Sequence, residues 1–159
     1  MKKRVATYSK IYIQVIFAVS HRANLLSAEW EESLYKYITG IVQNKEQFLL
    51  AINGYRDHIH ILLNIRPSCR LSDLVREIKK SSTEFINTQH LAKGHFSWQE
   101  GYGAFSYSRW DVDRIIDYIK NQKQHHERKS FHEEYLDFLK ESDIDYNDEY
   151  LFGWIDEHA

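Results

Sequence analysis

A strand with two chemically different faces stands out in the middle of the sequence, where the chain is His58-Ile59-His60-Ile61-Leu62-Leu63-Asn64. Alternate side chains of a strand point to opposite faces of the sheet, so His58 and His60 share one face, roughly 6–7 Å apart at Cβ. Ile59, Ile61 and Leu63 point the other way, toward a predicted helix layer. The spacing lets both imidazoles reach one cation, although an isolated His-x-His is more often two polar residues on an exposed sheet face.

The segments around this strand alternate between extended and helical patterns. We predict strands over residues 10–19, 48–52 and 58–64, and further extended segments at 95–99 and 104–108. Predicted helices, in which apolar residues recur at spacings of three and four, cover residues 28–45, 73–88, 111–128 and 131–140. Asn53-Gly54 is a turn signal between the second and third strands.

This order of elements predicts the fold class. A βαββαβ succession followed by helices is typical of an α+β, ferredoxin-like or RRM-like antiparallel sheet with helices on one face. The strand at 10–19 is almost continuously apolar, which indicates that the second face of the sheet is also covered, by the chain itself or by a partner.

The composition fits a single folded domain over residues 1–159, since the chain is 43% hydrophobic and 28% charged. No run of 18 apolar residues is present, so the sequence predicts no membrane-spanning helix. The single cysteine, Cys69, excludes an internal disulfide framework and a zinc site built from several cysteines. A reducing, cytoplasmic location is therefore the default expectation.

Charge is distributed unevenly along the chain. Residues 1–130 carry 20 basic against 13 acidic residues, whereas the segment 131–159 carries 1 against 10. A basic body can contact phosphates through counterion release. The acidic segment would oppose such contacts, so we expect it on the outer side, away from any nucleic acid. Ordinary solvated surface would explain each basic residue taken alone, and the candidates for phosphate contacts are Lys10, Arg22, Arg56, Arg70, Lys79, Lys80 and Lys123.

Tyr118 and Gln122 lie four residues apart in the helix predicted over 111–128, and therefore share one helix face. This face is offset from the apolar stripe at Ile115, Ile116 and Ile119, which predicts that both side chains are accessible. A lone helical tyrosine is more often a packing residue. Beside the histidine pair, however, an amide oxygen and two imidazoles form an incomplete coordination shell for Mg²⁺ or Mn²⁺. A phenol nearby could then attack a phosphate that the metal polarises.

Several segments, in this order, resemble the single-tyrosine HUH transposases, small enzymes of insertion sequences that move as single-stranded DNA. The family combines a His-hydrophobic-His strand with a Tyr-x-x-x-Gln helix about 60 residues later, and the likeness covers roughly residues 8–155. The matching segments are Tyr55-Arg56-Asp57-His58-Ile59-His60-Ile61-Leu62, Lys79-Lys80-Ser81-Ser82, Trp98-Gln99-Glu100-Gly101-Tyr102-Gly103-Ala104-Phe105-Ser106 and Tyr118-Ile119-Lys120-Asn121-Gln122-Lys123-Gln124-His125-His126.

The resemblance implies a metal-dependent enzyme that cleaves and rejoins single-stranded DNA. Tyr118 would be the nucleophile, forming a 5′-phosphotyrosine link and releasing a 3′-OH. His58, His60 and Gln122 would be the ligands of a divalent metal, Mg²⁺ or Mn²⁺. The family recognises hairpins near the ends of the element and works as a homodimer with a merged sheet, in which the tyrosine helix of one subunit can complete the metal site of the other.

Two other functions remain open on the sequence. A replication or conjugation nickase of the HUH type also uses a histidine pair and a tyrosine, often with a third histidine as ligand. A non-catalytic RRM-like module that binds single strands is the second, because Glu100–Tyr107 faintly resembles an RNP1 strand. Glu100 in place of a basic residue argues against this module.

Overall fold

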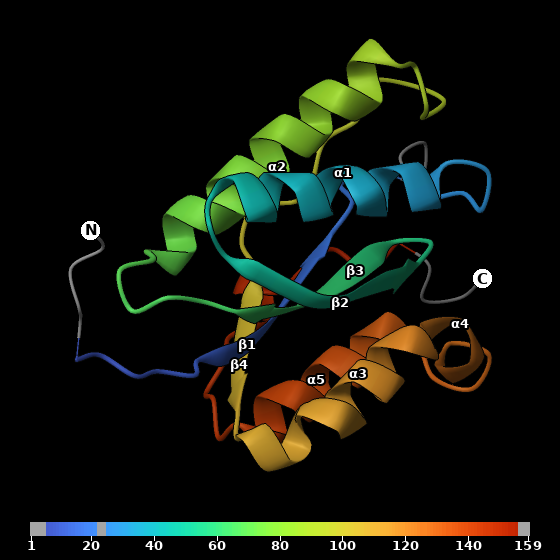
Figure 1. The fold of residues 1–159 in the computed structure, drawn as a ribbon. Coiled ribbons are helices and arrows are strands. Elements are labelled where there is room, and N and C mark those ends of the chain that lie inside the picture. The colour runs from blue at the N-terminus through green and yellow to red at the C-terminus, as the bar shows by residue number, and fades with distance from the viewer. Residues whose placement is uncertain (1–5, 22–24, 156–159) are drawn as a thin grey trace.

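The computed structural model describes residues 6–21 and 25–155, and within them the chain forms one four-stranded antiparallel sheet in the order β2-β3-β1-β4 (Figure 1). The strands are β1 Tyr12–Ala18, β2 Phe48–Tyr55, β3 His58–Asn64 and β4 Gly103–Tyr107. The helices are α1 Glu31–Asn44, α2 Leu71–Thr88, α3 Val112–Lys120, α4 Gln122–His125 and α5 Phe131–Glu141, with single 3-10 turns at Arg109–Asp111 and Asp148–Tyr150. This strand order confirms the predicted ferredoxin-like α+β fold.

The two central strands bring the histidine-bearing strand against the apolar N-terminal strand. β1 pairs with β3 so that Ile16 lies opposite His60 and Ala18 opposite His58. On its other side β1 pairs with β4. Both histidines therefore lie in the interior of the sheet, where the surrounding backbone limits their movement.

One face of the sheet packs against α1 and α2 (Figure 1). Ile59, Ile61 and Leu63 point into this layer, as the alternation in β3 predicted, and join the main core. Leu34 and Ile38 of α1 meet them there, fully buried. The apolar half of β3 is thus the base of the core, which leaves the histidine half for the opposite face.

The opposite face is covered by the chain's own C-terminal helices, α3, α4 and α5 (Figure 1). A second apolar cluster forms here, in which Leu62 and Tyr12 contact Ile115 and Ile119 of α3. β1 is consequently buried on both faces, as its composition predicted, by helices of the same chain. A partner subunit is not needed to cover it.

The acidic segment does not lie on the outer side, and that prediction is wrong. Its helix α5 packs against the histidine face, with Phe131, Tyr135 and Leu139 buried in the core. Farther on, Phe152 packs against Phe131 with ring centroids 5.8 Å apart. The apolar side of α5 faces the sheet. Most of the acidic residues between 131 and 155 point away from it, at exposed positions where water solvates their charge.

Two local predictions also differ from the structure. Asn53-Gly54 is not a turn, because β2 continues to Tyr55 and the reversal takes place at Arg56, which has a φ of 54°. Gly54 instead allows β2 to approach β3 closely, since a Cβ at this position would collide with the backbone oxygen of His58. The helix predicted over 111–128 is divided at Asn121, where the φ of −99° and ψ of 22° interrupt α3 and start α4.

No helix within residues 6–21 and 25–155 has the length and apolar character needed to span a bilayer.

Candidate active site

The imidazoles of His58 and His60 lie side by side on the face of the sheet beneath α5, and both are fully buried. Their ring centroids are 5.0 Å apart. Phe131, the first residue of α5, stacks on the ring of His58 at 3.9 Å and nearly parallel. Packing therefore holds the ring of His58 in place before any ligand binds.

The outer nitrogen of each ring contacts an oxygen acceptor. His58 Nδ1 lies 2.8 Å from Asp57 Oδ1, and His60 Nδ1 lies 2.7 Å from Gln14 Oε1. Gln14 is itself oriented, because its Nε2 donates to Tyr107 Oη at 2.7 Å. Such partners select the tautomer with the hydrogen on Nδ1 and leave Nε2 free to bind a metal.

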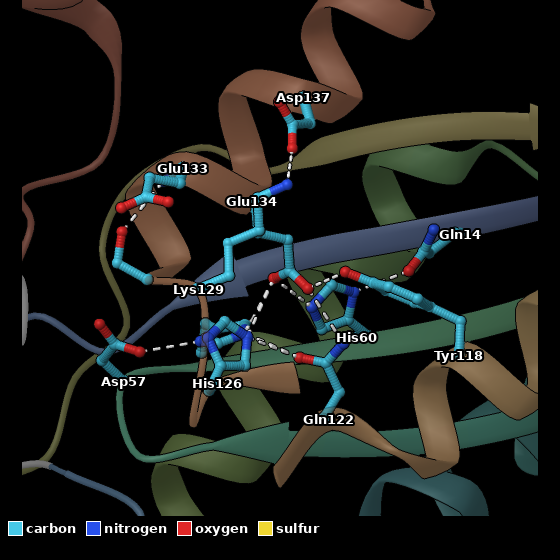
Figure 2. A network of polar contacts seen from close by, with 12 residues as sticks. Gln14, Asp57, His60, Tyr118, Gln122, His126, Lys129, Glu133, Glu134 and Asp137 are labelled. Atoms are coloured by element: carbon cyan, nitrogen blue, oxygen red, sulfur yellow. Dashed lines mark hydrogen bonds and ion pairs between the residues drawn. The ribbon is translucent and has the colours of Figure 1, made fainter. Parts of the chain in front are cut away.

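The Nε2 atoms point toward a carboxylate that the sequence did not predict, Glu134 of α5 (Figure 2). Glu134 Oε1 is 3.3 Å from His58 Nε2 and 3.0 Å from His60 Nε2. A third imidazole, that of His126 at the end of α4, places its Nε2 3.2 Å from the same oxygen. One donor atom from each of these four residues lies within 4.8 Å of the other three.

Gln122 reaches this cluster from α4, so the structure brings it together with His58. Its Oε1 lies 3.1 Å from His58 Nε2 and 3.0 Å from His126 Nε2, and its Nε2 donates to Glu134 Oε2 at 3.1 Å. The side chain is fully buried, which corrects the prediction that it is accessible. Burial follows from α5, which covers the face of α4 that carries Gln122.

Tyr118 borders the same cluster and is half-buried. Its hydroxyl donates a short hydrogen bond to Glu134 Oε2, and its ring lies 6.0 Å from the ring of His60. Burial and the neighbouring Glu134 carboxylate raise the pKa of Tyr118 above its usual value. The phenol is therefore protonated at neutral pH, and any attack by its oxygen requires a group that takes the proton.

Electrostatics in the cluster favour an ionised Glu134. Burial would raise the pKa of this carboxyl, but the imidazoles of His60, His126 and His58 outweigh burial and hold its pKa well below the ordinary value. Burial lowers the pKa of His60. Burial also acts to lower the pKa of His58, but contacts with Asp57 and Glu134 prevail and raise it to about 9.

The donor set fits a divalent cation. Imidazoles in their neutral form and an ionised carboxylate are ligands that such ions prefer, and the four donor atoms lie within 4.8 Å of one another. Glu134 is buried, and a cation here would bind the oxygen on which the three imidazoles already converge.

Two hollows flank the cluster. One, of about 230 Å³, is lined by Tyr118 and Glu134 together with Arg114 and Lys129. The other, of about 270 Å³, is lined by His126 with Arg56 and Lys129. A phosphate entering either hollow would meet basic side chains next to the cluster, and in the first hollow the carboxylates of Asp137 and Glu141 as well.

Several of the predicted phosphate-contacting residues already have protein partners. Lys79 Nζ donates to the backbone oxygens of Gln99 and Gly101 at 2.8 and 2.6 Å. Lys123 Nζ pairs with Glu31 at 2.8 Å, and Arg70 lies 3.8 Å from Asp73. Lys10 and Lys80 are exposed, Arg56 is partly exposed and lines a hollow beside His126, and Arg22 lies outside the described residues.

His126 and Glu134 are the site residues that sequence reasoning missed. For His126 a signal was present, because it follows Gln122 by four residues and so shares its helix face. Glu134 had no such signal, since nothing in the sequence distinguishes this buried glutamate from the other acidic residues among the ten of 131–159.

A four-stranded sheet with a histidine pair on its central strand, faced by a helical tyrosine, defines the chain as a single-tyrosine HUH transposase. The family model for IS200-like transposases matches residues 7–122, and the chain belongs to this family. The matched region ends at Gln122, so His126 and Glu134 lie beyond it.

Two solved structures are similar to the chain. A candidate transposase from Deinococcus radiodurans R1 has 25% identity and a TM-score of 0.59, over 77% of this chain and 98% of the other. A REP-associated tyrosine transposase bound to a REP hairpin has 19% identity and a TM-score of 0.57, over 79% of this chain and 74% of the other, which supports the fold alone. A comparison with curated proteins found no significant match.

Proposed function

We propose that this transposase cleaves and rejoins single-stranded DNA through a covalent 5′-phosphotyrosine link on Tyr118. The observation that carries the proposal is the position of the Tyr118 hydroxyl, which bonds to Glu134 beside the paired imidazoles of His58 and His60. A nucleophile and a set of metal-binding donors are thereby combined within one chain.

In the proposed cleavage step, Tyr118 Oη attacks the phosphorus of the scissile phosphodiester. A P–Oη bond forms, the bond from phosphorus to the 3′ oxygen breaks, and that oxygen takes up a proton to become a free 3′-OH. The phenol proton leaves toward Glu134 Oε2, the atom to which the hydroxyl already donates. Glu134 thus orients the oxygen and passes the departing proton on to solvent, because its low pKa does not let it keep the proton.

The metal, Mg²⁺ or Mn²⁺, would be held by His58, His60 and Gln122, and when bound it supplies Lewis-acid polarisation of the phosphate. Asp57 and Gln14 keep the two imidazoles aimed at it. Arg114 and Lys129, which line the hollow at Tyr118, are placed to neutralise phosphate charge by exchanging their present partners, Asp111 and Asp137, for the phosphate. In strand transfer a 3′-OH attacks the phosphotyrosine, and one phosphoester replaces another, so no ATP is required.

The proposed substrate is single-stranded DNA that carries a hairpin near each end of the element. Family membership and the excess of basic residues in 1–130 support this choice, and a relative of similar fold was solved with a REP hairpin. Single strands also expose bases that can stack on aromatic rings.

The test uses a labelled hairpin substrate, the full-length chain and Mn²⁺, with products separated on a denaturing gel. We expect a slow-migrating protein–DNA adduct and a shortened strand, because the phosphotyrosine link survives denaturation. Tyr118→Phe should abolish the adduct and retain hairpin binding, whereas Tyr150→Phe, at an exposed tyrosine, should behave as wild type. An adduct of normal yield with Tyr118→Phe would exclude this nucleophile.

The same assay separates the other two functions. Cleavage of an origin-type site without joining of element ends would indicate a nickase. Intact DNA in the presence of Mn²⁺, despite tight binding, would indicate a non-catalytic module.

The homodimer that the resemblance implies is part of the proposal, and its active site need not be shared. Tyr118 meets His60 within one chain in this structure, so each subunit of such a dimer could be complete. Light scattering measures the mass, and a mixture of Tyr118→Phe and His60→Ala subunits distinguishes the arrangements. Sites built within one chain stay inactive in the mixture, whereas sites shared between subunits recover cleavage.

A further inference from the structure

We propose that His126 and Glu134 are metal ligands, which complete with His58 and His60 a centre of three imidazoles and one carboxylate. The inference deepens the proposed function, since it concerns the metal of the same site. It adds two residues beyond the region that the family model matches. Gln122 remains in this centre as a fifth donor, since its Oε1 lies 3.1 Å from His58 Nε2 and 3.0 Å from His126 Nε2.

The first argument is the spacing of the donor atoms. Three Nε2 atoms, from His58, His60 and His126, lie 3.3, 3.0 and 3.2 Å from the single oxygen Glu134 Oε1. Ligands bound to one small divalent ion at about 2.0–2.1 Å are separated from each other by about 3 Å. The three separations from Glu134 Oε1 therefore match those of neighbouring ligands in one coordination shell, and all four donor atoms lie within 4.8 Å of one another.

The second argument is the direction of the lone pairs. Nδ1 of His58 and Nδ1 of His60 each face an oxygen acceptor, Asp57 Oδ1 and Gln14 Oε1, and so carry the ring hydrogens. At His60 the Nε2 lone pair then faces the oxygen of Glu134, which is an acceptor as well. His58 Nε2 is directed at the same oxygen and offers its lone pair once this imidazole is neutral. A hydrogen can bridge only two of these atoms, whereas one metal ion between them satisfies all four donors.

The third argument is charge. Glu134 and Asp57 are 3% and 5% exposed, so two carboxylates are buried at this cluster. Each contacts an imidazole of the cluster, Asp57 at His58 Nδ1 and Glu134 at three Nε2 atoms. A divalent cation at these Nε2 atoms would add positive charge next to both carboxylates, where buried negative charge is costly unless it is paired.

The composition of the centre determines the class of metal. Two imidazoles and an amide oxygen would bind Mg²⁺ poorly and Mn²⁺ moderately, whereas a third imidazole shifts preference further toward transition metals. We therefore expect Mn²⁺ to bind more tightly than Mg²⁺ to the free protein.

The test is calorimetric titration of the metal-free, full-length chain with Mn²⁺. His126→Ala and Glu134→Gln should each weaken Mn²⁺ affinity by more than about 100-fold, because loss of an outer-shell partner alone has an effect of about 10–100-fold. The chain offers matched controls in the adjacent exposed residues, and His125→Ala and Glu133→Gln should bind as wild type. Wild-type affinity in both His126→Ala and Glu134→Gln would overturn the inference.

A measurement on the wild type alone covers the case in which a variant does not fold. Pulsed EPR of the Mn²⁺-loaded chain resolves couplings to coordinated imidazole nitrogens. Three imidazoles support the proposed centre, and two overturn it.

The outcomes also separate this inference from the proposed function. Loss of Mn²⁺ binding in His126→Ala, with a wild-type chain that forms no DNA adduct, supports the metal centre and rejects the tyrosine chemistry. An adduct from the wild type, with unchanged Mn²⁺ affinity in both variants, rejects the centre and retains the chemistry.

Discussion

The carboxylate of Glu134 contacts the Tyr118 hydroxyl and the Gln122 amide through Oε2, while its Oε1 faces three imidazoles. At the scale of single residues, this division gives each oxygen a separate task. One oxygen points to the metal-binding donors and the other holds the proton of the nucleophile. A change at Glu134 should therefore affect metal binding and cleavage together, whereas Tyr118→Phe should affect cleavage alone.

Proton competition at His58 predicts how metal binding depends on pH. The pKa of His58 is raised to about 9, so in the metal-free protein this imidazole carries a proton below that pH. A metal ligand must be neutral, and binding has to displace the proton. We expect Mn²⁺ affinity to increase from about pH 7 toward pH 9, with protons released on binding. Calorimetry in two buffers of different ionisation enthalpy counts these protons, and an affinity that does not change with pH would contradict the prediction.

Two glycines provide a matched test of backbone packing. A Cβ at Gly54 would meet Ile59 Cγ2 at 2.9 Å as well as the backbone oxygen of His58, whereas a Cβ at Gly40 in α1 meets nothing within 4 Å. Gly54→Ala should lower the free energy of unfolding by about 1–3 kcal/mol through overpacking. Gly40→Ala should raise it by up to about 1 kcal/mol through helix propensity. Urea denaturation measures both changes, and equal effects would show that the approach of β2 to β3 is not tight.

At the scale of elements, α5 determines whether the site is complete. It supplies Glu134, which reaches the imidazoles (Figure 2). It also stacks Phe131 on His58 and covers the buried Gln122 of α4. The break at Asn121 contributes as well, since it starts α4, the short helix that carries Gln122 and ends next to His126. Helices α3, α4 and α5 thus cover the histidine face of the sheet, and the site lies between these helices and the sheet.

The N-terminus of α5 can be weakened without touching the site. Ser130 caps this helix, because its side chain accepts a hydrogen bond from the backbone N–H of Glu133 at 3.2 Å. Ser130→Ala should lower the free energy of unfolding by about 1 kcal/mol, the usual effect of losing such a cap. Ser142→Ala, at the exposed other end, should change it by less than about 0.5 kcal/mol. Denaturant unfolding provides the comparison, and an unaffected Ser130→Ala variant would mean that packing alone holds α5.

At the scale of the whole molecule, the site ties together parts of the chain that are far apart in sequence. Asp57, His58 and His60 come from the turn before β3 and from β3 itself, Gln14 from β1, and Glu134 from α5. The sheet is the rigid support, and the three C-terminal helices are held to it partly through the polar cluster. A metal bound there would connect both layers.

Metal removal should therefore lower the stability of the whole protein. A ligand that binds only the folded chain stabilises it by about 2.7 kcal/mol at a free concentration 100 times its Kd. For a chain of this size each kcal/mol corresponds to roughly 2–4 °C in Tm. We expect Mn²⁺ to raise Tm and EDTA to reverse the increase, with His126→Ala showing a smaller response than His125→Ala. Calorimetric scans with and without Mn²⁺ measure this, and a Tm independent of metal would contradict it.

The amino-acid sequence by itself determined the features that depend on local periodicity. A period of two in β3 placed His58 and His60 on one face and Ile59, Ile61 and Leu63 on the other. A spacing of four placed Tyr118 and Gln122 on one helix face, and the order of elements determined the sheet. Only the tertiary structure decided which faces meet. The burial of Gln122, the inclusion of His126 and the insertion of Glu134 all follow from α5 packing its apolar side onto the histidine face, a contact between segments about 70 residues apart, which no local pattern encodes.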